Sequence, residues 1–112
     1  MNVILPLPPS ANRLWRYANG RAYVTREARA YKELCYWTAK KQGANPLDGP
    51  VILRGTVYFG RKNGDLTNRI KILEDALEGA CYHNDSQVVR IDLAKGYDKE
   101  QPRVELDVLE AI

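Results

Sequence analysis

The chain has 112 residues, of which 45% are hydrophobic, and its formal net charge is +3 at pH 7. This length suits one globular domain with a modest core, so a single domain over residues 1–112 is expected. No segment approaches the roughly 20 apolar residues of a membrane helix, and no signal-peptide pattern opens the chain, so we expect a cytoplasmic protein with no membrane partner. Cys35 and Cys81 lack the spacing of a zinc site or of a disulfide framework.

The charges divide unevenly between the two halves of the chain. Residues 1–56 carry 9 basic and 3 acidic residues, whereas residues 57–112 carry 8 basic and 11 acidic residues. A basic segment attracts phosphate, and carboxylates are the ligands that Mg²⁺ prefers. This division is typical of a small enzyme that acts on DNA.

The N-terminal half is predicted to form short strands followed by one long helix. The apolar pattern predicts a strand at Asn2 to Leu5, a possible strand at Arg21 to Val24 and a helix at Thr25 to Gln42. Within that helix, we interpret Tyr31 and Trp37 as residues of the core or of a subunit interface.

The segment before this helix mixes cations with aromatic residues, as proteins that hold phosphate and stack on unpaired bases do. Arg13 and Arg16 lie near Asn12, in what we expect to be an irregular segment. We predict that these three residues contact DNA. The alternative is a solvated helix face with aromatic residues in the core.

A strand is predicted at Val51 to Phe59, and a helix from about Thr67 to Gly79. The helix is indicated by apolar residues that recur every three or four positions, Leu66, Ile70, Leu73 and Leu77. About 100° per residue then places four polar residues on the opposite face: Asn68, Lys71, Asp75 and Glu78. Asp65 sits just before the first turn, so Lys71 points the same way as the acids.

Simple structural roles are available for several of these polar residues. Thr67 has the residue type and position of a helix N-cap, which we prefer to a ligand role. Asp65 and Asp85 are candidates for turn formers in their local sequences. Asp75, four residues after Lys71, is placed to form a helical ion pair with it, and we prefer this role to metal binding.

The C-terminal part is predicted to contain two more strands, at Gln87 to Lys95 and Arg103 to Glu110, which we expect to pair as an antiparallel hairpin. Val104, Leu106 and Val108 alternate with polar residues and should face one way. The predicted fold class is α+β, a small mixed β-sheet with two α-helices in a single domain. Whether Asp85 returns to the start of the preceding helix stays open at this point.

Several segments together resemble the RusA family of Holliday junction endonucleases. The resemblance rests on Asp65-x-x-Asn68-x-x-Lys71, then Asp-Ala-Leu at residues 75–77, then Asn-Asp-Ser-Gln-Val at residues 84–88. The opening Leu-Pro-Leu-Pro-Pro-Ser-Ala-Asn-Arg at residues 5–13 supports it, so the resemblance covers nearly the whole chain.

The resemblance implies a RusA-like endonuclease fold and a set of site residues. Asp65, Lys71 and Asp85 would be catalytic, and Asp65 and Asp85 would hold Mg²⁺, for which Mn²⁺ is a possible substitute. Asn68 and Arg69 join the expected DNA-binding residues. Thr67 stands where the family pattern has a second aspartate.

The implied function is Mg²⁺-dependent resolution of Holliday junctions by paired symmetric nicks, in DNA recombination and repair, by a homodimer. The partner would be a four-way junction or other branched DNA. The alternative is a branched-DNA-binding protein whose cleavage is weakened or lost because of Thr67.

Overall fold

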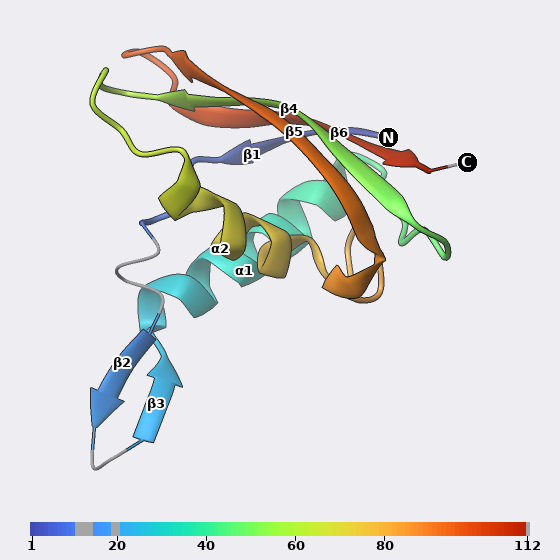
Figure 1. The fold of residues 1–112 in the computed structure, drawn as a ribbon, viewed down its shortest axis with the longest axis horizontal. Coiled ribbons are helices and arrows are strands. Elements are labelled where there is room, and N and C mark those ends of the chain that lie inside the picture. Colours follow the sequence, from blue (N-terminus) through green and yellow to red (C-terminus); the bar gives the residue numbers. More distant parts are fainter. Residues whose placement is uncertain (11–14, 19–20, 112) are drawn as a thin grey trace.

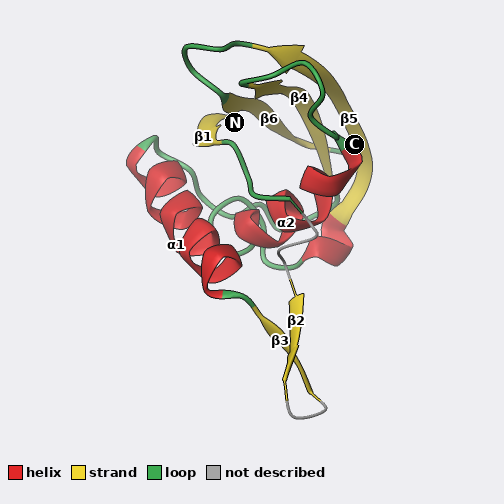
Figure 2. Cartoon of the chain, turned by 90° about the vertical axis from the view of Figure 1, so that its left-hand side faces the viewer, coloured by secondary structure: helices red, strands yellow, loops and turns green. Residues whose placement is uncertain are grey.

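The computed structural model describes residues 1–10, 15–18 and 21–111, with side chains at 1–10 and 25–111. Four strands form one sheet in the order β1-β6-β4-β5. They are β1 (Asn2–Pro6), β4 (Val51–Phe59), β5 (Val88–Tyr97) and β6 (Arg103–Glu110). Two helices, α1 (Arg26–Lys41) and α2 (Thr67–Leu77), lie on one side of this sheet (Figures 1 and 2). The predicted α+β fold is confirmed.

The first helix begins and ends almost where the sequence predicts. Thr25 is its N-cap, with the hydroxyl accepting a hydrogen bond from the backbone N–H of Ala28 at 3.2 Å. After the C-cap Gln42, Gly43 adopts a φ of 91°, a left-handed conformation that favours glycine. The buried residues follow helical spacing and face the core: Ala28, Tyr31, Cys35 and Ala39.

The two aromatic residues singled out in this helix have different environments. Tyr31 is buried, and its hydroxyl donates to the Pro6 carbonyl at 2.7 Å, which ties α1 to the end of β1. Trp37 is 63% exposed and contacts only the edge of Tyr36 among the rings of the described residues. Tyr31 therefore belongs to the core, whereas Trp37 does not, and for Trp37 the alternative of a subunit interface stays a prediction.

The buried face of α2 is wider than the predicted apolar stripe. Ile72, Leu73, Ala76 and Leu77 are buried. Ile70 is only half-buried. Ile72 is buried because α2 packs against both α1 and the sheet, so the apolar surface of the helix is wider than one stripe. The helix ends at Leu77, before the predicted end at Gly79.

The predicted terminal hairpin is wrong. β5 pairs with β4 in parallel, and β6 pairs antiparallel with β4 on its other side, so β4 separates the two C-terminal strands. A parallel pair needs a crossover connection, which α2 supplies between β4 and β5. β6 also pairs antiparallel with β1. Its alternating residues Val104, Leu106 and Val108 are all buried, so they face one way as expected.

The edge formed by β1 is covered by a side chain. The Gln42 amide accepts a hydrogen bond from Ile4 N at 2.8 Å and donates one to Ile4 O at 2.7 Å. Open strand edges invite pairing with other chains, and Gln42 satisfies the outward-facing groups at the centre of this one.

A separate two-stranded hairpin, β2 (Trp15–Ala18) and β3 (Arg21–Val24), projects away from the sheet (Figures 1 and 2). The second strand was predicted, whereas the first lies in the segment expected to be irregular. The expectation of an irregular segment is wrong for residues 15–18, which pair antiparallel with β3. Arg16 lies in β2, and Asn12 and Arg13 lie outside the described residues.

Neither described helix has the length and apolar content needed to traverse a lipid bilayer.

Candidate active site

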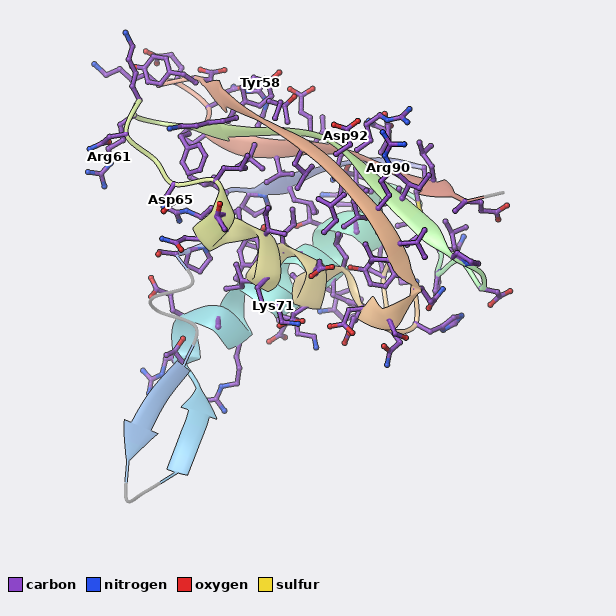
Figure 3. All side chains as sticks on the ribbon, viewed as in Figure 1. Tyr58, Arg61, Asp65, Lys71, Arg90 and Asp92 are labelled. Carbon is purple, nitrogen blue, oxygen red and sulfur yellow. The ribbon has the colours of Figure 1, made fainter. Side chains whose placement is uncertain are left out.

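Lys71 joins two acidic residues on the exposed side of α2. Its Nζ lies 3.1 Å from Asp85 Oδ2 and 3.2 Å from Asp75 Oδ1. The hydrogen bond to Asp85, followed by that to Asp75, raises the pKa of Lys71 above its ordinary value. Lys71 is thus a protonated cation held at a fixed point on the helix surface (Figure 3).

Asp85 is positioned by the turn that follows α2. It opens a short 3-10 helix, η2 (Asp85–Gln87), whose N-cap Asn84 accepts a hydrogen bond from Ser86 N at 2.8 Å. The Gln87 side chain accepts from Asn84 N at 3.0 Å and completes a capping box. These bonds explain Asn84 and Gln87 in the Asn-Asp-Ser-Gln sequence, because their side chains build the turn.

Glu78 connects this turn back to α2. Its Oε1 accepts a hydrogen bond from Asp85 N at 2.9 Å, and its Oε2 lies 4.0 Å from Lys32 Nζ on α1. One carboxylate oxygen from each of Asp75, Glu78 and Asp85 lies within 4.8 Å of the other two. Sequence reasoning placed Glu78 on the polar face of the helix but assigned it no role. Its spacing of seven residues from Lys71 was the available signal.

Asp65 organises the opposite end of α2. Its Oδ1 accepts a hydrogen bond from Thr67 N and its Oδ2 accepts one from Asn68 Nδ2, both at 3.1 Å. The predicted N-cap role of Thr67 is wrong, since Thr67 is the first helical residue and the Asp65 carboxylate receives its backbone N–H instead. Asp65 thus performs the turn-forming role that its sequence allowed.

The structure therefore brings Lys71 and Asp85 together and leaves Asp65 at the start of the helix. An 11-residue helix is about 16 Å long, and Asp75 lies in its C-terminal half. Asp65 is not among the three acidic residues that converge near Lys71. Asn68 contacts Asp65, and the predicted DNA-binding residue Arg69 donates to the Pro8 carbonyl.

The donor set fits a hard divalent cation. The converging ligand atoms are all carboxylate oxygens, which Mg²⁺ and Mn²⁺ accept. Cys81 is buried, and the His83 ring lies 2.9 Å from Asp48 on the exposed surface.

Comparison with known proteins decides the family. The family model described as Endodeoxyribonuclease RusA matches residues 6–109. The chain belongs to the RusA family. The family predicted from the motifs, and with it the class of endodeoxyribonuclease, is confirmed.

Curated relatives of the RusA family align over nearly the full chain. The crossover junction endodeoxyribonuclease RusA of Escherichia coli K12 is 33% identical, and the alignment covers 97% of this chain and 93% of that protein. The proteins of the same name from Shigella sonnei and Enterobacteria phage 82 are each 32% identical over the same shares. The RusA motif that led to the family therefore lies within a match that extends over both helices and nearly all of the chain.

Proposed function

We propose that this chain is a crossover junction endodeoxyribonuclease, which resolves four-way DNA junctions by paired symmetric nicks in recombination and repair. The observation that carries the proposal is the contact between Lys71 Nζ and Asp85 Oδ2 at 3.1 Å, which joins two separate parts of the family motif. The printed names of the relatives support the choice of substrate. We also propose a cytoplasmic location, because the DNA substrate is inside the cell.

The cofactor in this proposal is Mg²⁺, with Mn²⁺ as a substitute. Asp85 would hold it together with a second carboxylate, which is Asp65 by the family motif or Asp75 by the convergence of their oxygens within 4.8 Å. When bound, the ion would supply an activated water and would stabilise the charge that develops on the scissile phosphate. Mg²⁺ commonly takes one or two carboxylates and completes its shell with water and phosphate oxygens, so a pair of aspartates is a sufficient protein contribution.

Lys71 acts from the middle of the helix. Its ammonium group, kept protonated by Asp85 and Asp75, lies where negative charge accumulates on the cleaved phosphate and stabilises it there. Asn68 holds the Asp65 carboxylate in place through its 3.1 Å hydrogen bond. DNA contacts are assigned to Asn12, Arg13, Arg16, Asn68 and Arg69.

The assembly in this proposal is a symmetric homodimer. A four-way junction is close to two-fold symmetric, and two identical sites related by a two-fold axis can cut opposite strands. Leu34 and Trp37, which are 52% and 63% exposed on α1, are large apolar side chains that a partner would cover.

The function is tested by incubating an end-labelled four-way junction with the protein in Mg²⁺ and in Mn²⁺. A flap substrate and a linear duplex serve as comparisons, and Asp85→Asn and Asp75→Asn are the matched variants. We expect paired symmetric incisions in the junction, abolished in Asp85→Asn and retained in Asp75→Asn. Loss of cleavage in both variants would assign the metal to the converging acids rather than to Asp65 and Asp85.

A second candidate follows from Thr67. This residue is exposed and neutral at the first position of α2, two residues from Asp65, where the family pattern has an aspartate. In this case the chain would bind branched DNA without cutting it. Tight junction binding with no incision in either metal ion would identify this candidate, and preferential cutting of the flap would change the substrate while keeping the chemistry.

A further inference from the structure

A hollow of about 340 Å³ opens beside the start of α2. Its walls come from four separate parts of the chain and include Leu7, Gly60, Arg61, Gly64, Arg69 and Pro102. Small-molecule pockets in proteins have volumes of roughly 300 to 1,000 Å³, so this hollow has room for one nucleotide. We propose that it binds a nucleotide of the DNA substrate that flanks the scissile phosphate, an inference that rests on the proposed action on DNA.

The shape of the hollow is built into the sequence of the loop between β4 and α2. Phe59, at the end of β4, is 2% exposed and forms the base of the hollow. Gly64 lies so close to this ring that a Cβ at residue 64 would overlap its atoms. At Gly60, a Cβ would lie 3.1 Å from Pro102 Cγ. The two glycines let the loop pass over the ring without side chains that would fill the space.

The charge around the hollow is positive. Arg61 is exposed on the loop, and the guanidinium carbon of Arg69 lies 5.4 Å from the centre of the Phe59 ring. Lys95 Nζ lies 5.6 Å from the same ring centre and donates to the Lys62 carbonyl at 2.9 Å. None of the residues that line the hollow is acidic. An anion is therefore favoured at its mouth.

The walls add an apolar component that a phosphate group alone would not use. Leu7 and Pro102 present hydrocarbon surface on two sides of the hollow, while Arg61 and Arg69 supply the cations. A ligand with a flat, partly apolar body and an attached phosphate matches both features. A nucleotide with its base turned away from its partner strand is such a ligand.

The position of the hollow connects it to the proposed chemistry. Gly64, in its wall, is followed directly by Asp65, whose carboxylate caps α2. Figure 3 shows Arg61 and Asp65 at the same end of α2, on the loop that enters the helix. A nucleotide in the hollow therefore lies beside the residue assigned to the metal, and its identity would influence which phosphate is cut.

The test measures binding without cleavage, in EDTA, to a series of four-way junctions that each carry one abasic residue near the crossover. For the unmodified protein we expect one position at which the missing base weakens binding roughly tenfold, the order of a lost stacking contact. Leu7→Trp, which fills the hollow, should bind the intact junction as weakly as the unmodified protein binds that abasic junction. In this variant the missing base should have no further effect.

Arg61→Ala provides a second variant in an exposed loop, where the fold is not at risk. Its effect and that of the critical abasic residue should not add, because both remove parts of one contact. Arg90→Ala removes the same charge from an exposed position on β5. In this variant the missing base should weaken junction binding by the same factor as in the unmodified protein.

The outcomes separate this inference from the function on which it rests. Equal binding of every abasic junction by the unmodified protein would overturn the nucleotide subsite alone. Failure of the unmodified protein to bind any junction would overturn the proposed function and the subsite with it.

Discussion

Lys71 Nζ and Asp85 Oδ2 lie 3.1 Å apart although 14 residues separate them in the chain. The contact closes the connection between α2 and β5, because Asp85 N is bonded in turn to Glu78 near the end of the same helix. The cation that we assign to catalysis is therefore positioned by one of the carboxylates that we assign to the metal.

Replacing Lys71 by alanine should remove this cation while the junction is still bound through the other basic residues. We expect single-turnover cleavage in Mg²⁺ to fall roughly 10²- to 10³-fold, as when one donor to a transition state is lost elsewhere. Lys32→Ala is the matched control, since Lys32 contacts Glu78 in the same cluster at 4.0 Å and should leave the cleavage rate close to that of the unmodified protein. Equal losses in the two variants would mean that Lys71 has no specific role.

Replacing Thr67 by aspartate should lower the Mg²⁺ concentration needed for activity. A unit charge about 4 Å from a cation is worth roughly 4 kcal/mol at an effective dielectric of about 20, opposed by desolvation and by repulsion from Asp65. Thr67 is exposed, so only part of this energy should be realised. Mg²⁺ titrations of cleavage for Thr67→Asp and for its neutral counterpart Thr67→Asn would measure the effect. An unchanged midpoint in Thr67→Asp would separate Thr67 from metal binding.

Replacing Arg13 and Arg16 by alanine should weaken junction binding and flatten its dependence on salt. Each phosphate contact that is lost reduces the slope of log K against log salt by about 0.9 for duplex DNA. Arg16 lies in β2 of the hairpin that projects from the body of the protein. Affinities over a range of salt concentrations check this, with Arg90→Ala as the charge-matched control. A slope equal to that of the control would remove the two arginines from the DNA-binding surface.

The two cysteines should be unreactive while the protein is folded. Burial raises the pKa of Cys35 to about 12 and that of Cys81 to about 11, and both side chains are at most 1% exposed. The thiolate is the reactive form, so a disulfide reagent near neutral pH should modify neither residue in the native protein and both in denaturant. Rapid modification of the native protein would show that α1 or the α2–β5 turn opens readily.

Asp98 should contribute to stability except in acid. Its hydrogen bond with Arg103, at 2.7 Å, holds the pKa of Asp98 below its ordinary value. A lowered pKa in the folded state means that the contribution is present above about 3.9, the value for an unfolded chain, and is lost as the pH falls through the folded value. The difference in unfolding midpoint between the unmodified protein and Asp98→Asn should therefore be constant near neutral pH and shrink in acid. A pH-independent difference would indicate packing rather than charge.

Elements with strong local signals were predicted well from the sequence. The threonine cap, the spacing of buried residues and Gly43 mark the ends of α1, and alternation marks β6. The pairing of β5 was not predictable in the same way, because its residues are mostly exposed and no alternation shows which strand lies beside it. Adjacency in the chain suggested β6, whereas the α2 crossover places β5 next to β4.

The candidate site shows a similar division. Motif resemblance supplied Asp65, Lys71 and Asp85, and helical spacing supplied Asp75 and Glu78. The convergence of Glu78 with Asp85 depends on the turn at residues 79–84, whose path is fixed by tertiary contacts. One of these is the hydrogen bond from the buried Tyr82 hydroxyl to Glu74 O, at 2.6 Å.

The bond pair between Gln42 and Ile4 has a consequence for aggregation. A sheet grows into a fibre only if both of its outer strands can accept a further strand, because each added copy must present a new edge to the next. With the centre of β1 covered by Gln42, strand pairing at β5 can join this sheet to one other copy, but no free edge then remains for a third. A single glutamine at the end of α1 thus limits edge-to-edge assembly through the four-stranded sheet to a closed pair.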